Sequence, residues 1–340
     1  MATIPTVAKA WRFPPTEPSL WDGHRSLELR DVPVPKPGKG EVLVRMRAAA
    51  LNARLDIKVS LGQYAGATFT TGPDNGGLIP TCDGSGEIVA IGEDVTRRTV
   101  GDRVHSLFLS PQYRIFPADF CMPVPEHLSY EEAASITCAG ITAFKCLFES
   151  GSTGPESTVL VLGSGGVSVY GAQFAKAVGA RVIATTSSEE KARKYKDIGV
   201  DHVINYRDTP NWADEVKNLT VGQGVDQVFE IGGQGTLMEA IRAIKPGGVI
   251  HVISAPSIPE DGTPTTSIQE LAIALLLKEG KLNGVVTGAR DVAERLDAFI
   301  SEHNIKPVLD PKVFGWGEAV EAFEYIKGGA HFGKVVIRID

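Results

Sequence analysis

The chain has 340 residues, of which 43% are hydrophobic and 22% are charged, with a formal net charge of −7. These values are ordinary for a globular protein of two domains, and the negative charge argues against a general nucleic-acid or anionic-membrane surface. No apolar run approaches the roughly 20 residues of a membrane span. The first residues lack the basic and apolar regions of a secretory signal, and the four cysteines show no paired spacing. We therefore expect a cytoplasmic protein in a reducing compartment.

Residues 1–128 are predicted to form a β-rich domain. Short apolar runs, such as 41–47 and 86–91, are separated there by proline and glycine turns. The pattern then changes, because residues 130–136 and 142–148 read as helices that lead into a glycine turn.

A βαβ unit is predicted at residues 157–187. A continuous apolar run at 159–162, typical of a strand in a parallel sheet, is followed by a glycine turn, a helical pattern and a second strand. Such a turn can hold the diphosphate of a dinucleotide at the N-terminus of the helix. The third glycine of the usual pattern falls on Ser168, and a tight turn without a ligand is the alternative. The predicted cofactor-binding residues of the turn are Gly163, Gly165, Gly166 and Val167.

The end of the second strand indicates which cofactor binds. An NAD site usually places an Asp or Glu about 20 residues after the first glycine, whereas residues 185–188 are all Thr or Ser and Lys191 follows. No carboxylate there repels a 2′-phosphate, and hydroxyls and a cation can bind one. The sequence therefore favours NADPH, held by Ser187, Ser188 and Lys191. The alternative role for Ser187 is to cap the next helix, with Glu190 completing a capping box.

Strands continue to alternate with helices after this unit. Three more strands are predicted at 202–206, 227–231 and 249–253, a short sixth strand at 285–286, and a final strand at 334–338. The alternation predicts an α/β fold with a doubly wound parallel sheet, whose ligand crevice lies at the carboxyl ends of the strands.

A series of short motifs runs through nearly the whole chain, at residues 40–45, 49–52, 82–92, 101–104, 138–142, 163–167, 245–248 and 331–334. With them the chain resembles the medium-chain dehydrogenase/reductase superfamily, and within it the quinone-oxidoreductase-like and zinc-type alcohol dehydrogenase-like reductases. The resemblance implies a GroES-like catalytic domain at 1–128 and a Rossmann dinucleotide-binding domain at 129–275. Residues 276–340 are expected to complete the Rossmann sheet and return to the catalytic domain.

The resemblance also implies further cofactor contacts. Thr142 would contact the nicotinamide carboxamide, Tyr206 would lie near the adenosine phosphate, and Ile253 and Val286 would offer backbone groups to the nicotinamide end. Lys334 is similar to a cofactor-contacting lysine of the family. Structural roles are the alternatives for three of these residues. Thr142 would be a helix-end hydroxyl bonded to backbone, Tyr206 a strand-end aromatic ring, and Lys334 a surface lysine at the start of a strand.

Two catalytic residues are implied by the same resemblance. Asn52 matches an asparagine that lies beside the nicotinamide in zinc-free relatives, where its amide can hydrogen-bond a substrate carbonyl. A buried asparagine bonded to backbone is the alternative. Tyr64 resembles an active-site tyrosine, although one extra residue separates it from Asn52.

Zinc alcohol dehydrogenases of the superfamily take catalytic ligands from a Cys, a His-Glu pair and a second Cys. This chain carries Asn52, Cys82 with Asp83, and Cys138 at those places. Asparagine is a poor zinc ligand, and the four-cysteine lobe for structural zinc is absent from the sequence, so we expect no metal. A remnant site at Cys82, Asp83 and Cys138 is the alternative.

The sequence thus predicts an NADPH-dependent oxidoreductase that transfers hydride to an enone, enal or quinone without a metal. A zinc-dependent alcohol dehydrogenase and an NADPH-binding protein without turnover are the alternatives. The resemblance further implies a homodimer in which the sheets of the cofactor domains pair edge to edge, with the strand at 249–253 as the edge.

Overall fold

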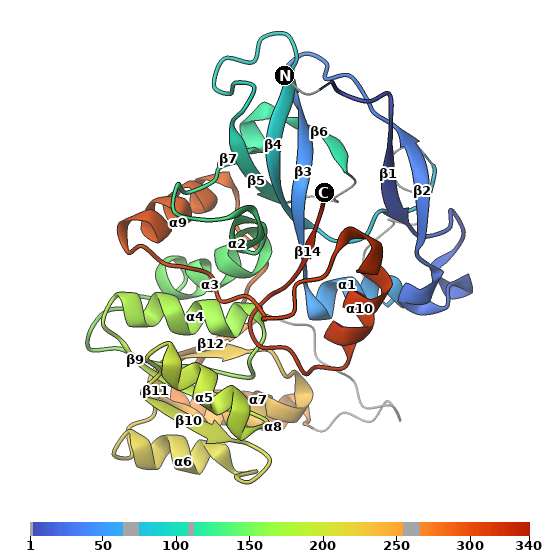
Figure 1. Cartoon of the computed structure of the whole chain (residues 1–340). Helices are drawn as coiled ribbons and strands as arrows, with labels where there is room; N and C mark the ends of the chain where they lie inside the picture. Colours follow the sequence, from blue (N-terminus) through green and yellow to red (C-terminus); the bar gives the residue numbers. More distant parts are fainter. Residues whose placement is uncertain (1–2, 64–74, 108–111, 254–265) are drawn as a thin grey trace. The chain divides into compact units, whose positions relative to one another are not determined.

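The computed structural model describes residues 3–63, 75–107, 112–253 and 266–340 (Figure 1). The chain divides into two units: residues 1–139 together with 293–340, called unit 1 here, and residues 140–292, called unit 2. The division into 1–128, 129–275 and 276–340 made from the sequence stays a prediction.

Unit 1 is built on an antiparallel sheet with strand order β14-β3-β4-β5-β7, in which β6 also pairs with β3. The first half of the long strand β3 pairs with β6 and the second half with β14, the last strand of the chain. Val335 of β14 lies opposite Leu51 of β3, so Lys334 is brought to the end of β3. The strands are β3 (Glu41–Leu51), β4 (Asp83–Ile91), β5 (Arg103–Leu107), β6 (Tyr113–Pro117), β7 (Met122–Pro123) and β14 (Val335–Arg338).

Helices and a hairpin-like strand pair complete unit 1. The pair β1 (Val7–Arg12) and β2 (Glu28–Pro33) is antiparallel. One apolar core, which includes Phe13, Leu51 and Phe323, joins the end of β3 to helix α10. The helices are α1 (Ala53–Ser60), α2 (Tyr130–Ala134) and α10 (Ala319–Lys327). Helix α9 (Arg290–Glu302) and a π-helical turn at Ile136–Gly140 lie mostly in unit 1 and extend just across the boundary with unit 2.

Unit 2 contains a six-stranded sheet with the order β10-β9-β8-β11-β12-β13, and each neighbouring pair is parallel. Helices alternate with these strands, which confirms the predicted doubly wound α/β fold. The strands are β8 (Thr158–Val161), β9 (Arg181–Thr186), β10 (His202–Asn205), β11 (Val225–Glu230), β12 (Ile244–Val252) and β13 (Lys281–Gly284). The helices are α3 (Ile141–Phe144), α4 (Gly166–Ala177), α5 (Glu189–Asp197), α6 (Trp212–Leu219), α7 (Gln234–Ala243) and α8 (Ile268–Lys278).

Two expectations about the edge of this sheet are wrong. The sixth strand is β13 at Lys281–Gly284 and not 285–286, and it pairs with β12. Strand β12 is therefore interior, between β11 and β13, and cannot be the edge. The sequence misled because the edge strand reads Lys-Leu-Asn-Gly, which has no apolar run, whereas β12 has the buried residues that suit an interior strand.

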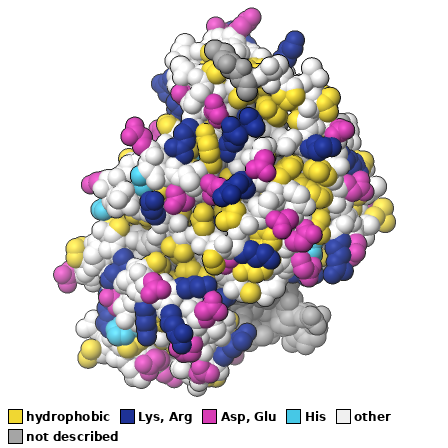
Figure 2. Space-filling view, viewed as in Figure 1, with side chains coloured by type: hydrophobic (Ala, Val, Ile, Leu, Met, Phe, Trp, Pro, Cys, Tyr) yellow, Lys and Arg dark blue, Asp and Glu magenta, His cyan; other side chains and the backbone are white. Residues whose placement is uncertain are grey.

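The described surface carries charges of both signs. On the face drawn in Figure 2, the described Lys and Arg side chains are interspersed with Asp and Glu, which leaves no broad basic field. Among the helices of the described ranges, none has the length and hydropathy that a membrane crossing requires.

Candidate active site

The glycine turn of unit 2 is fixed from both sides by buried hydroxyls. Gly163 has a φ of +70°, a conformation that favours glycine. Its N–H donates to Thr185 Oγ1 (3.2 Å), and its carbonyl accepts from the hydroxyl of Tyr195 (2.6 Å). Burial raises the pKa of Tyr195, so this hydroxyl remains a donor. Sequence reasoning missed Tyr195, because it lies in helix α5, 32 residues beyond the turn.

Helix α4 shows why the third glycine of the motif can be a serine. Ser168 is fully buried and its hydroxyl donates to the carbonyl of Leu162 (2.6 Å), so it closes the turn. The close approach of helix to strand occurs instead at Gly171, where a Cβ would lie 2.5 Å from Cε2 of Phe229. The helix has Gly165 as its N-cap and no side-chain cap, which leaves its first turn suited to a diphosphate.

The carboxyl end of β9 carries hydroxyls and no carboxylate. The N-cap of α5 is Ser188, which accepts from the N–H of Lys191 (3.3 Å), so the alternative in which Ser187 caps this helix is wrong. Tyr206 donates its N–H to Thr186 O (3.0 Å) and keeps 41% of its surface exposed. The buried Oγ1 of Thr186 has no hydrogen-bond partner within the described ranges. These groups fit the adenosine end of a dinucleotide.

The other predicted cofactor residues of unit 2 also occupy definite places. Because the strands are parallel, their carboxyl ends share one edge of the sheet. Ile253 follows β12 at this edge and donates its N–H to Glu230 O (3.0 Å). Val286 follows β13, is 75% exposed, and its carbonyl accepts from Lys145 Nζ (3.4 Å). Thr142 is buried in α3. Their contacts with a cofactor stay predictions.

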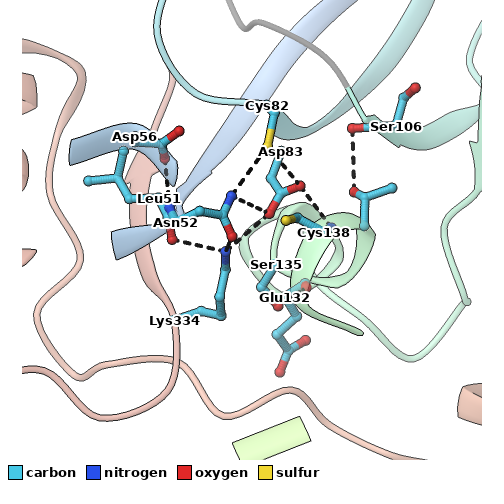
Figure 3. A network of polar contacts seen from close by, with 11 residues as sticks. Leu51, Asn52, Asp56, Cys82, Asp83, Ser106, Glu132, Ser135, Cys138 and Lys334 are labelled. Atoms are coloured by element: carbon cyan, nitrogen blue, oxygen red, sulfur yellow. Dashed lines mark hydrogen bonds and ion pairs between the residues drawn. The ribbon is translucent and has the colours of Figure 1, made fainter. Parts of the chain in front are cut away.

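In unit 1, the predicted residues Asn52 and Lys334 meet in one buried polar network (Figure 3). The ammonium of Lys334 donates to Leu51 O (2.9 Å), Asn52 Oδ1 (2.8 Å) and Asp83 Oδ2 (3.0 Å). The side chains of Lys334 and Asp83 are 3% and 0% exposed. Burial is the largest single influence and lowers the pKa of Lys334, but the charge and the hydrogen bond of Asp83, together with the two neighbouring cysteines, outweigh it and raise that pKa above its ordinary value. Lys334 is therefore charged, and all three of its N–H groups have acceptors.

Lys334 also sets the orientation of the Asn52 amide. An ammonium can only donate, so the atom that faces it must be the amide oxygen of Asn52. The amide nitrogen then points to Asp83 Oδ2 (3.0 Å) and to Cys82 Sγ (3.4 Å). Asn52 is the N-cap of α1, yet its side chain makes no cap. Instead the carboxyl of Asp56 accepts the backbone N–H of Asn52 at 2.6 Å. The side-chain amide of Asn52 therefore takes no part in capping the helix and bonds within the network.

Burial raises the pKa of Asp56 to about 7, with smaller effects from the hydrogen bond to Asn52 and from the charges of Lys334 and Asp83. Asp56 is only 4% exposed. Its carboxyl is therefore about half protonated near neutral pH. The other aspartate of the network, Asp83, forms an ion pair with Lys334.

The two thiols complete the network. Sγ of Cys82, a carboxylate oxygen of Asp83 and Sγ of Cys138 lie within 4.8 Å of one another. Cys138 lies in the π-helical turn and donates its backbone N–H to Asp83 Oδ1 (2.9 Å). Contact with Cys138, burial and the charge of Asp83 raise the pKa of Cys82, so its thiol keeps its proton.

These residues do not fit a zinc ion as they are arranged. Three donor atoms at this spacing resemble a zinc ligand set. However, both oxygens of Asp83 already accept hydrogen bonds, and the ammonium of Lys334 neutralises its charge. Asn52 directs N–H groups, not its oxygen, toward Cys82 and Asp83. A zinc site would need Asp83 released and the thiols deprotonated.

The second predicted catalytic residue, Tyr64, lies outside the described residues. Its role stays a prediction. The pairing of Lys334 with Asp83 was missed by sequence reasoning, because the two residues are 251 positions apart and meet only through the pairing of β14 with β3.

Comparisons with known proteins cover most of the chain. A family model described as "Alcohol dehydrogenase GroES-like domain" matches residues 38–126, and one described as "Zinc-binding dehydrogenase" matches residues 166–302. A zinc-type alcohol dehydrogenase-like protein of Schizosaccharomyces pombe is 35% identical over 345 residues, covering 94% of this chain and 96% of that protein. The 2-methylene-furan-3-one reductase of Solanum lycopersicum is 30% identical over 350 residues, covering 98% and 80%. A solved mycobacterial protein complexed with NADPH has a TM-score of 0.81 and 26% identity, covering 97% of this chain and 99% of its own.

Proposed function

Since the chain belongs to the medium-chain dehydrogenase/reductase superfamily and is an NAD(P)-dependent oxidoreductase, we propose that it uses NADPH to reduce an enone, enal or quinone without a metal. The observation that carries this proposal is the buried ion pair of Lys334 with Asp83, which holds the Asn52 amide without a metal. We place it in the reducing cytoplasm, a proposal supported by four cysteines that form no disulfide in the structure.

The preference for NADPH rests on the end of β9. Ser187 and Ser188 stand where an acidic residue would repel a 2′-phosphate, and Lys191, which is only 9% exposed, places a cation in the first turn of α5. The solved mycobacterial relative was complexed with NADPH. When bound, NADPH supplies the hydride.

The role proposed for Asn52 follows from its two unequal hydrogen bonds. The bond to Asp83 is charge-assisted, whereas the bond to Cys82 Sγ has a weak acceptor. A substrate carbonyl could therefore capture the hydrogen that faces sulfur while the amide stays held by Lys334 and Asp83. An amide fixed in this way stabilises the negative charge that develops on the carbonyl oxygen. The name of the tomato relative describes a methylene group conjugated with a ketone, which is this substrate class.

The test is the consumption of NADPH by the purified chain with a panel of enones, enals and quinones, with and without a chelator. We expect turnover that the chelator does not change. Lys191→Ala should raise the KM for NADPH roughly tenfold and leave that for NADH unchanged. Lys194→Ala, in the same helix, is the matched control. Asn52→Ala should lower kcat about a hundredfold without changing the affinity for NADPH. No turnover with any of the panel would remove the proposal.

A zinc-dependent alcohol dehydrogenase is the second candidate, favoured by the spacing of Cys82, Asp83 and Cys138. In that case stoichiometric zinc should copurify, and a chelator should remove both the metal and the oxidation of alcohols.

We also propose that two copies pair through the edge strand β13. Its outer edge lacks a partner strand in the described part of the sheet. Helix α8 comes directly before β13 in the chain and is mostly apolar, yet none of its residues is buried. Three of its apolar side chains are at least 75% exposed: Ile268, Leu276 and Leu277. Light scattering should give a dimer, and the double change Leu276→Lys with Leu277→Lys should give a monomer. A wild-type monomer would contradict this pairing.

A further inference from the structure

The network in unit 1 contains a buried ammonium that bonds directly to one of three clustered side chains of metal-ligand type. Lys334 and Asp83 are both almost fully buried, and the ammonium makes three hydrogen bonds of 2.8–3.0 Å. A buried lysine is rare unless it is paired, and removal of one partner leaves the other charge uncompensated. The chain therefore maintains this cation at a site whose other polar groups are metal-ligand types.

Two oxygens that could ligate a metal are occupied by this one ammonium. They are Oδ2 of Asp83 and Oδ1 of Asn52. The bond to Asn52 also turns the amide so that its N–H groups, which cannot ligate a metal, face Cys82 and Asp83. The remaining oxygen of Asp83, Oδ1, accepts the backbone N–H of Cys138. With the ammonium in place, only the two thiol sulfurs are therefore without such a bond, which is fewer than the three protein ligands that a catalytic zinc site has.

Charge leads to the same conclusion. The ion pair is neutral as it stands, so the carboxylate of Asp83 presents no uncompensated charge to a dication. Without the ammonium, the carboxylate of Asp83 would be buried and unpaired, and a bound dication would neutralise it together with one thiolate.

We propose that the ammonium of Lys334 takes the place of a metal ion in this enzyme, so that it excludes zinc from Cys82, Asp83 and Cys138 and its removal creates a zinc site there. The amide oxygen of Asn52, released from Lys334, becomes the fourth ligand. This inference deepens the metal-free part of the proposed function and rests on it. It assigns Lys334 a positioning role and not a catalytic one.

The experiment compares the wild type with Lys334→Met and Lys334→Arg. Zinc affinity is measured by competition with a chromophoric chelator, and Co²⁺ serves as a spectroscopic probe because cobalt–thiolate bonds absorb in the near ultraviolet. We expect Lys334→Met to bind one zinc ion per chain about 10- to 100-fold more tightly than the wild type. Lys334→Arg, which keeps the charge, should behave as the wild type. In the Lys334→Met background, Cys138→Ser should abolish the cobalt–thiolate absorption.

Equal zinc affinity in the wild type and Lys334→Met, whether tight or weak, overturns the inference. If Lys334→Met does not fold by circular dichroism, Lys334→Gln replaces it, because the glutamine amide can still donate to Leu51 or Asp83. The wild type alone is a further test, since stoichiometric zinc with cobalt–thiolate absorption in the unmodified chain also overturns the inference. None of these readouts uses turnover, so the two proposals can fail separately. If the wild type reduces enones but Lys334→Met binds zinc no more tightly than the wild type, this inference is refuted and the proposed function stands.

Discussion

Asp56 predicts an unusual pH dependence of stability for unit 1. Burial raises the pKa of its carboxyl from 3.8 to about 7. The folded protein therefore binds this proton more tightly than the unfolded chain. The stabilisation is complete below pH 3.8 and is lost as the pH rises through about 7. Asp56→Asn removes the titration, while the amide oxygen of the new residue can still accept the N–H of Asn52.

The magnitude follows from the two pKa values. The full difference corresponds to about 4 kcal/mol of unfolding free energy, of which about 2 kcal/mol is lost between about pH 5.5 and about pH 8. As the pH rises from about 5.5 to about 8, the unfolding free energy of Asp56→Asn should therefore increase by about 2 kcal/mol relative to that of the wild type. Only this difference isolates Asp56, because other groups titrate equally in both proteins.

Urea denaturation followed by tryptophan fluorescence is the assay. Three of the four tryptophans, Trp11, Trp21 and Trp316, belong to unit 1, so the signal reports mainly the unit that contains Asp56. Asp31→Asn is the matched control, since Asp31 is 68% exposed and pairs with a surface lysine. The difference in unfolding free energy between Asp31→Asn and the wild type should be the same at both ends of this pH range. A stability difference between Asp56→Asn and the wild type that stays constant from about pH 5.5 to about pH 8 would refute the reasoning.

Three further outcomes are expected in unit 2. Gly171→Ala should lower stability by about 1–3 kcal/mol in thermal denaturation, because its Cβ would overlap a facing aromatic ring, whereas Gly235→Ala meets no atom within 4 Å and should not. Tyr195→Phe removes a hydrogen bond from the glycine turn and should weaken NADPH binding several-fold by calorimetry, with little change in circular dichroism. Burial lowers the pKa of His251 to about 4, so unit 2 should lose up to about 3 kcal/mol as the pH falls from 6.5 to about 4, and His251→Gln should abolish this loss. If His251→Gln loses the same stability on acidification as the wild type, the loss comes from other groups and the prediction is wrong.

The sequence by itself determined the fold class and the position of the glycine turn. A strand buried on both faces must be continuously apolar, and a turn that passes from strand to helix needs glycine at Gly163. Both are local requirements, so they are visible in a few consecutive residues. The same reasoning failed at β13, because an edge strand carries no such requirement.

The tertiary structure alone decided what surrounds Asn52. The family resemblance identified Asn52, Cys82 and Cys138 as neighbours of a metal or substrate site, and it implied a cofactor contact for Lys334, which stays a prediction. The structure gives the ammonium of Lys334 three protein acceptors, because the pairing of β14 with β3 places a residue near the C-terminus beside the end of a strand formed by residues 41–51. A contact between residues so far apart has no local pattern. The same holds for the hydrogen bond between Tyr195 and the glycine turn.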